Sequence, residues 1–213
     1  MKPIDTIVFD YGGVLADHYV EPFQTQLGEL LHTNQKGTRE LTSEKSPHGR
    51  DYRLGKITKQ DFWNEIKKLS NTEFDIDYAH DLFEKTYIPN PAMLSLVEWL
   101  KDKWGIQIGL GMNEDVDRWE HVRELINTDE LAHFGVISFE IGVIKPNKFF
   151  YETMLKKAQR EQYPSRVMYV DDRDTHVEAA ISHGMQGYHF INPGDFVSAL
   201  HNMKLEKFTP KIL

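Results

Sequence analysis

The sequence predicts an α/β fold, a doubly wound parallel sheet (Rossmann-like core) with an inserted helical cap domain. Three short apolar runs, Thr6 to Phe9, Gln107 to Leu110 and Arg166 to Val170, have the length and composition of buried parallel strands. A polar or glycine-rich turn follows each run, and then a stretch with helical spacing, which is the order of crossover connections. Gly135 to Phe139 and Gly187 to Ile191 are two further strand candidates.

The segment between the first two strands has a different character, because residues 20 to 86 contain little strand signal. Apolar residues from Phe23 to Leu31 have helical spacing. A second helix begins after Thr58, which forms a capping pattern with Asp61. A third is expected from Asp77 to Tyr87, and the polar stretch from Thr33 to Gly49 is expected to be a loop.

The change of character sets the expected domain boundaries. Residues 17–88 are predicted to form the helical cap, and residues 1–16 and 89–213 the α/β core. Asn90-Pro91 marks the return to the core, because proline is well tolerated in the first turn of a helix.

Composition excludes several classes of protein. The chain has 213 residues, of which 40% are hydrophobic, with a formal net charge of -8. An acidic surface repels phosphate backbones, so we expect no nucleic-acid partner. There is no cysteine, and the apolar runs are far shorter than the ~20 residues of a membrane helix. The N-terminus does not resemble a signal peptide. We therefore expect a cytoplasmic protein without membrane contact.

Ligands in an open α/β sheet bind at the carboxyl ends of the strands, near the point where strand order reverses. The residues that follow the predicted strands and turns, and that we take as candidates, are Asp10, Gly12, Gly111, Met112, Asn113, Lys145, Asp171 and Asp172. Each alone has an ordinary structural explanation, as a turn, a cap or a surface residue. Their shared position after successive strands favours a functional site.

The chemistry of these side chains indicates a phosphate site. Carboxylates without thiols or clustered histidines suit a hard cation, and magnesium is the leading candidate. A carboxylate can attack phosphorus, and a lysine can balance the charge that gathers there. A helix that starts near Gly12 or Gly111 would present free N–H groups to phosphate oxygens.

Four motifs, in order and over nearly the whole chain, resemble those of the haloacid dehalogenase superfamily. They are IVFDYGGVL, IQIGLGMN, GVIKPNKFFYETML and VMYVDDRDTHVEAAISHGMQGYHF. A segment of the predicted cap, DYRLGKITKQDFWNEI, resembles the phosphatases related to the epoxide hydrolase N-terminal domain and to sugar-phosphate phosphatases.

This resemblance implies a magnesium-dependent phosphatase that acts on a small phosphorylated metabolite. Asp10 would be the nucleophile and would form an aspartyl phosphate, with Lys145 bridging it to the phosphate. Mg²⁺ would be held by Asp10, the backbone carbonyl of Gly12 and Asp172, with Asp171 in support. Gly12, Gly111, Met112 and Asn113 would bind the substrate's phosphate.

Two positions depart from the family pattern. Gly12 stands where typical members have a second aspartate, which protonates the leaving group, although some members of this branch also have glycine. Met112 stands where they have Ser or Thr, and a thioether cannot donate a hydrogen bond. Backbone N–H groups at Met112 and Asn113 are a partial substitute. His18, near the first motif, is a candidate replacement acid.

Other functions stay open at this point. A catalytically weak relative that binds a phosphorylated ligand or a protein partner is the main alternative. A phospho-acceptor signalling domain has its acidic pair first in the chain, whereas Asp171-Asp172 come last here. A dinucleotide-binding fold lacks its glycine fingerprint after the first strand. Neither the substrate nor the oligomeric state follows from the sequence.

Five residues of the predicted cap are considered as substrate contacts: His48, Arg50, Tyr52, Arg53 and Trp63. For each of them, packing in the core or exposure at the surface is the simpler explanation.

Overall fold

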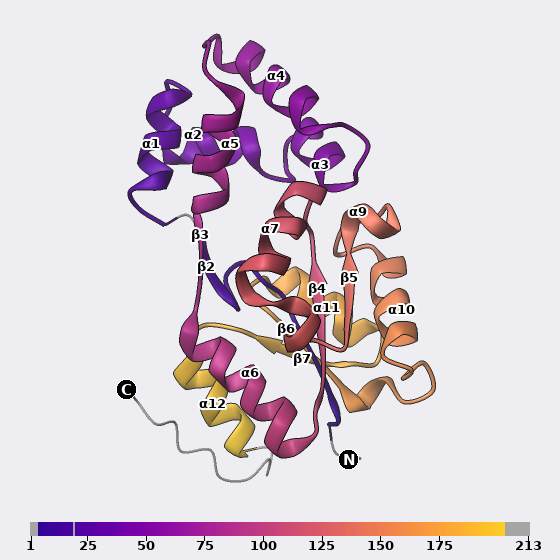
Figure 1. Cartoon of the computed structure of the whole chain (residues 1–213). Coiled ribbons are helices and arrows are strands. Elements are labelled where there is room, and N and C mark those ends of the chain that lie inside the picture. Colours follow the sequence, from indigo (N-terminus) through magenta and orange to yellow (C-terminus); the bar gives the residue numbers. More distant parts are fainter. Residues whose placement is uncertain (1–3, 19, 203–213) are drawn as a thin grey trace.

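The central element of the computed structural model is a sheet of five parallel strands in the order β5-β4-β1-β6-β7 (Figure 1). The structure describes residues 4–18 and 20–202, so residues 1–3, 19 and 203–213 of the predicted core and cap lie outside the described residues. The strands are β1 (Thr6–Phe9), β4 (Gln107–Met112), β5 (Phe134–Ile137), β6 (Val167–Asp171) and β7 (Gln186–His189). All five predicted strands are confirmed, with ends shifted by one or two residues where they differ.

Helices cover both faces of this sheet, so the doubly wound fold is confirmed (Figure 1). Ile7 and Phe9 pack on one face with α6 (Pro91–Trp104), α7 (Val116–Ile126) and α12 (Pro193–Asn202). Val8, which points to the other face, packs with α10 (Lys148–Lys157) and α11 (Asp174–Ser182). The short helices are α8 (Thr128–Leu131), α9 (Ser138–Ile141) and the 3-10 turn Pro164–Arg166.

A helical insertion, which comprises five helices of the described chain, lies at one end of the molecule (Figure 1). These are α1 (Phe23–Leu30), α2 (Gln35–Thr42), α3 (Pro47–Arg53), α4 (Lys59–Ser70) and α5 (Ile76–Lys85). Its own core is centred on Phe62 and Trp63, which are fully buried. The capping box that begins α4 is confirmed, because Thr58 Oγ1 accepts from Asp61 N and the Asp61 carboxylate accepts from Thr58 N.

The prediction of a loop from Thr33 to Gly49 is wrong, because α2 and most of the first turn of α3 lie within it. Asn34 and Ser46 cap these two helices by accepting hydrogen bonds from backbone N–H groups three residues further on. Pro47 occupies the first turn of α3. Glycine at position 49 reflects close packing rather than disorder, since a Cβ there would lie 2.1 Å from the Ser43 carbonyl oxygen.

A pair of antiparallel strands that the sequence did not indicate joins the insertion to the core. β2 (Ala16–His18) pairs with β3 (Tyr87–Pro89), and the helix expected up to Tyr87 therefore ends at Lys85. The predicted boundaries at residues 17 and 88 fall within this pair, and the domain division itself stays a prediction. Asn90 caps α6, which begins at Pro91 as expected.

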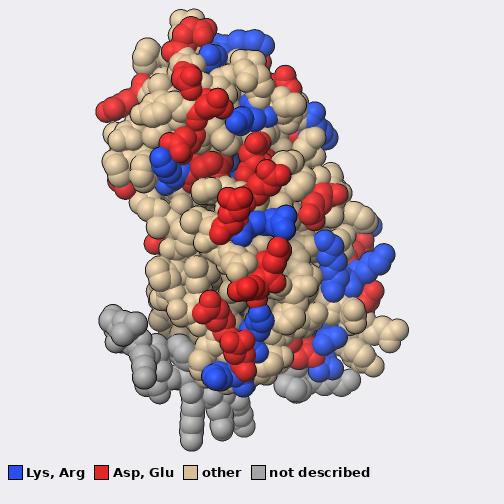
Figure 2. All heavy atoms as spheres, viewed as in Figure 1, with Lys and Arg blue, Asp and Glu red and all other residues tan. Residues whose placement is uncertain are grey.

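The surface carries both signs of charge. On the face seen in Figure 2, acidic and basic side chains are interspersed over the insertion and the core, and no continuous basic surface is visible there. Among the described residues, no helix combines the length and the apolar character that crossing a membrane requires.

Candidate active site

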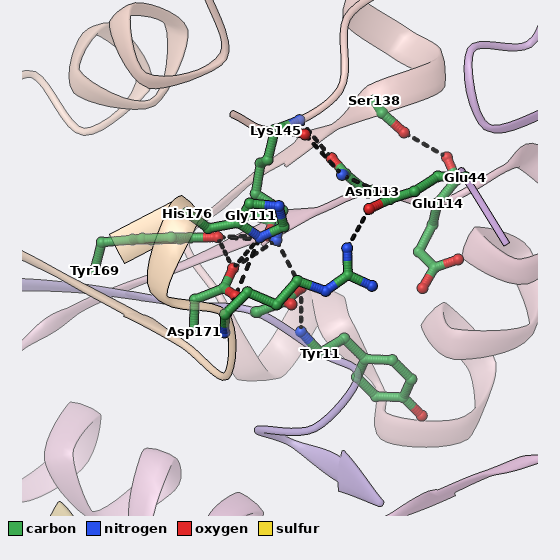
Figure 3. Close-up of polar contacts among 12 residues, drawn as sticks. Tyr11, Glu44, Gly111, Asn113, Glu114, Ser138, Lys145, Tyr169, Asp171 and His176 are labelled. Atoms are coloured by element: carbon green, nitrogen blue, oxygen red, sulfur yellow. Dashed lines mark hydrogen bonds and ion pairs between the residues drawn. The ribbon is translucent and has the colours of Figure 1, made fainter. Parts of the chain in front are cut away.

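The carboxyl ends of β1, β4 and β6 bring predicted site residues together at one edge of the sheet (Figure 3). Asp10 directly follows β1, and Asp171 is the last residue of β6. Lys145 lies in the turn before α10, and its Nζ is 2.9 Å from Asp10 Oδ1 and 2.9 Å from Asp171 Oδ2. The predicted association of these three residues is therefore present in the folded chain.

Lys145 is the buried centre of this network, with a side chain that is 1% exposed. Its ammonium also donates to the backbone carbonyl of Gly111 and to the Tyr169 hydroxyl, both at 2.9 Å. Burial favours the neutral amine, but the Asp10 and Asp171 carboxylates outweigh it and raise the pKa of Lys145 above its usual value. Lys145 is therefore a fixed positive charge beside Asp10.

Asp171 is a buried anchor for this lysine. Its carboxylate accepts from Tyr169 at 2.5 Å and from the backbone N–H of Arg173 at 2.9 Å, and it pairs with His176 Nδ1 at 3.1 Å. Burial opposes ionisation, yet Lys145 and these donors hold the pKa of Asp171 well below its usual range. The sequence did not single out Tyr169 and His176, although Tyr169 shares a strand face with Asp171.

Asp10 has the opposite electrostatic character. Burial raises the pKa of Asp10 to about 8, since the attraction of Lys145 is opposed by the neighbouring Asp171 and Asp172 carboxylates. Burial and Asp171 also raise the pKa of Asp172. An additional positive charge at this point would stabilise the ionised form of both carboxylates.

Two glycines let the chain pass close to these groups. Gly13 has a φ of +81°, and a Cβ there would lie 2.6 Å from Asp172 Oδ2. At Gly12, a Cβ would lie 2.7 Å from Cε1 of Tyr87, on β3. Tyr87 therefore occupies the space into which a side chain at position 12 would extend.

The donor set fits a hard divalent cation. Ligand atoms of Asp10, Asp171 and His176 lie within 4.8 Å of one another. Asp10, Gly12 and Asp172 line one small cavity of about 40 Å³, which we call the chamber. Asp171 does not line the chamber, and its carboxylate accepts hydrogen bonds from Lys145, Tyr169 and the Arg173 backbone. Carboxylate oxygens that repel one another in a confined space are typical ligands of Mg²⁺, and the predicted ligand set Asp10, Gly12, Asp171 and Asp172 stays a prediction.

The predicted phosphate-binding residues at the end of β4 and directly after it occupy three different environments. Met112 is fully buried in the core and does not line the chamber. Gly111 contributes its carbonyl to Lys145. Asn113 lines the chamber, accepts from the Lys145 backbone N–H at 2.8 Å and donates to Glu44 at 2.9 Å. The side chain of Asn113 thus positions the lysine turn.

The insertion and the strand pair close the chamber from the other side. Ser43, Glu44 and Arg53 of the insertion line it, as do His18 of β2 and Tyr87 of β3. Of the insertion residues considered from the sequence, Arg53 lines the chamber, whereas Trp63 is buried in the insertion core and the Tyr52 hydroxyl donates to Asp117. Arg50 is exposed beside a neighbouring groove and His48 contacts the Leu41 carbonyl.

Sequence reasoning missed three charged residues that line the chamber, Glu44, Glu114 and Arg173. Glu44 forms an ion pair with Arg173, and it also accepts from Asn113. Although burial opposes ionisation, Arg173 and Arg53 lower the pKa of Glu44. The position of Arg173 directly after the Asp171-Asp172 pair could have indicated that it belongs to the site. Glu44 lies in a turn with no motif around it, so no such indication was available for it.

Comparisons with known proteins identify the family of the chain. A family model described as haloacid dehalogenase-like hydrolase matches residues 4–184. No curated protein shows significant sequence similarity to the chain.

Solved structures share the fold at low sequence identity. A haloacid dehalogenase family enzyme from Bacteroides thetaiotaomicron, crystallised with magnesium and inorganic phosphate, has 17% identity and a TM-score of 0.73, over 87% of this chain and 93% of that one. A predicted hydrolase of this kind from Porphyromonas gingivalis has 19% identity and a TM-score of 0.75, over 96% and 99%. A phosphatase from Thermococcus onnurineus has 18% identity and a TM-score of 0.58, over 86% and 85%.

Proposed function

The chain belongs to the haloacid dehalogenase-like hydrolase family, and from this premise we propose that it is a magnesium-dependent phosphatase acting on a small phosphate monoester. The observation that carries the proposal is the contact of Asp10 with the buried ammonium of Lys145, in a chamber that Asp172 also lines. The magnesium-bound and phosphate-bound relative from Bacteroides thetaiotaomicron supports the choice of cation and of substrate.

In the proposed reaction, Asp10 is the nucleophile. One Asp10 oxygen attacks phosphorus in line and the ester oxygen departs, which leaves an aspartyl phosphate that water then hydrolyses. Lys145 holds the carboxylate in place and neutralises charge on the transferring phosphoryl group, and Asp171 fixes Lys145 from behind. Mg²⁺, held by Asp10, the Gly12 carbonyl and Asp172, would supply Lewis-acid stabilisation of the phosphoryl oxygens. The insertion acts as a cap that excludes water.

Leaving-group protonation is the step for which the first motif lacks its usual acid. We assign this step to His18, which lines the chamber and whose Nδ1 would lie 3.7 Å from a Cβ at position 12. Burial lowers the pKa of His18, although the Asp172 carboxylate opposes that shift. Burial thus favours the neutral imidazole, and the Asp172 carboxylate favours the protonated form that could donate to the leaving group.

The alternative function is a catalytically weak relative that binds a phosphorylated ligand or a protein partner. The observations that favour it are the side chain of Tyr87, which occupies the usual place of the acid, and the buried position of Met112. A relative that binds a phosphorylated ligand would share with the phosphatase a phosphate site beside Lys145, so turnover separates these two functions.

The test is phosphate release with and without magnesium, from activated aryl phosphates and from sugar and nucleotide phosphates. Wild type is compared with Asp10→Asn and with Asp195→Asn, a matched control in the first turn of α12. Release that requires magnesium and Asp10, but not Asp195, would support the phosphatase. A folded wild-type protein that binds magnesium and phosphate but releases none from any substrate would favour the alternative.

A further inference from the structure

The size of the chamber limits what it can hold. Its volume of about 40 Å³ is small beside the ~300–1,000 Å³ of typical ligand pockets. The leaving group of a phosphate monoester must therefore extend out of it. One adjoining cavity, an open groove of about 550 Å³, shares Glu44, Lys145, Arg173 and His176 with the chamber. A larger cavity of about 870 Å³ opens elsewhere in the insertion and contains none of the predicted catalytic, phosphate-binding or metal residues.

The charges around this groove are strongly one-sided. Its lining contains four basic side chains, Lys45, Arg50, Lys145 and Arg173, and one carboxylate, Glu44. Lys145 is already paired with Asp10 and Asp171, and Arg173 with Glu44, so the remaining positive charges are those of Lys45 and Arg50. The whole chain, in contrast, has a formal net charge of -8. A local excess of cations beside a phosphate site in an acidic protein attracts anions selectively.

Lys45 and Arg50 are available to a ligand. Both side chains are exposed, and among the described residues neither forms an ion pair with an acidic side chain. They lie on the insertion, in the turn before α3 and within α3, whereas Arg173 lies on the core. A ligand in the groove would therefore contact charges from both parts of the molecule.

Glu44 stands at the junction of the chamber and the groove. It pairs with Arg173 and accepts from Asn113 at 2.9 Å, so its own charge is already satisfied by core residues (Figure 3). Because Glu44 is committed to these contacts, it leaves Lys45 and Arg50 without a neutralising carboxylate in the groove.

We propose that this groove binds the leaving group of the substrate, and that this leaving group carries a second anionic group, a carboxylate or a phosphate. The inference rests on the proposed function, since it concerns the substrate of that same site. Lys45 and Arg50 are the specificity-determining residues, and they act on binding rather than on the chemical step.

The test uses substrate pairs that differ only in the second anion. Phosphoglycerate is compared with glycerol phosphate for the carboxylate, and fructose bisphosphate with fructose monophosphate for the phosphate. Wild type is compared with the double variant Lys45→Gln/Arg50→Gln. The control is Lys103→Gln/Lys156→Gln, which removes the same charge from exposed positions on α6 and α10.

Wild type should prefer the doubly anionic member of at least one pair, and the larger preference identifies the kind of anion. In Lys45→Gln/Arg50→Gln this preference should fall roughly two- to thirtyfold through KM, with kcat unchanged, as expected for two solvent-exposed ion pairs. The preference should also weaken at ~1 M salt, where the Debye length falls to ~3 Å. An absent preference, or an equal loss in the control variant, would overturn the proposal.

A binding measurement separates this inference from the phosphatase proposal. Calorimetric titration of the Asp10→Asn protein with the same four compounds, in the presence of magnesium, reports the preference without turnover. If wild type releases no phosphate but Asp10→Asn binds the doubly anionic compounds more tightly, the phosphatase proposal fails, whereas the assignment of the groove as the site of a second anionic group stands. If wild type releases phosphate but neither protein distinguishes the members of a pair, the phosphatase proposal stands and the groove proposal fails.

Discussion

Gly12→Ala is the substitution whose effect follows most directly from the structure. The new Cβ would lie 2.7 Å from Tyr87 Cε1, well inside the ~3.5–4.0 Å of an ordinary carbon contact. The Tyr87 ring cannot simply rotate away, because the Arg118 guanidinium lies 4.1 Å from its centroid and the Tyr11 ring stacks on it. The new Cβ can therefore be accommodated only if the Tyr87 ring or the groups packed against it shift.

The magnitude is the difference of two effects. Overpacking of this kind costs ~1–3 kcal/mol. Replacing glycine by alanine restricts the unfolded chain and returns ~0.4–1 kcal/mol where the backbone conformation permits it. We expect Gly12→Ala to lower the free energy of unfolding by about 1–2 kcal/mol, measured by urea denaturation with an unchanged m-value.

A double-mutant cycle with Tyr87→Ala assigns the effect to this contact. Removing the ring should abolish the cost of the new methyl group, which gives a coupling energy of about 1–2 kcal/mol. Gly135→Ala is the matched control, because a Cβ there meets nothing closer than 3.5 Å. Gly12→Ala with wild-type stability, or a cycle whose coupling lies within the ~0.5 kcal/mol error of additivity, would refute the reasoning.

Three further predictions concern charged residues. Lys145→Met leaves Asp10 and Asp171 without their shared cation, so kcat for phosphate release should fall ~10²–10³-fold; an unchanged kcat would remove Lys145 from the reaction. His18→Gln should slow poor leaving groups by ~10²–10⁴-fold while sparing activated aryl phosphates, and an equal effect on both classes would exclude its role as the acid. Burial raises the pKa of Glu84 to about 8 from 4.5, although its partner Arg118, 3.2 Å away, opposes this shift. The folded state therefore holds the Glu84 proton between these values, so stability from this group is fully present below about pH 4.5 and is lost as pH rises through about 8. Glu84→Gln should flatten this part of the curve of unfolding free energy against pH, and an unchanged curve would contradict the assignment.

Local signals in the sequence predicted much of the fold because they act over a few residues. Apolar runs such as Thr6–Phe9, which is buried along its whole length, are typical of parallel strands covered by helices on both faces. The Thr58–Asp61 capping box formed as expected, since both partners lie within one turn. The same kind of evidence failed from Thr33 to Gly49, where glycine and proline were taken as helix breakers but lie within the first turns of helices.

Contacts between distant segments could not be predicted in this way. The pairing of Ala16–His18 with Tyr87–Pro89 joins segments about 70 residues apart, and neither has a strong strand pattern. The ion pair of Glu44 with Arg173 likewise depends on how the insertion lies over the core. Such contacts follow from tertiary packing, which short-range periodicity does not encode.

The sequence by itself determined the five strands of the core sheet and placed Asp10, Lys145 and Asp171 at the carboxyl edge of that sheet. It could do so because parallel strands bring their ends to the same edge whatever surrounds them. Only the tertiary structure decided that Tyr87 occupies the space beside Gly12 and that Lys45, Arg50 and Arg173 border one groove. Those arrangements depend on side-chain packing between segments that are remote in the chain, where a shift of one ångström changes which atoms touch.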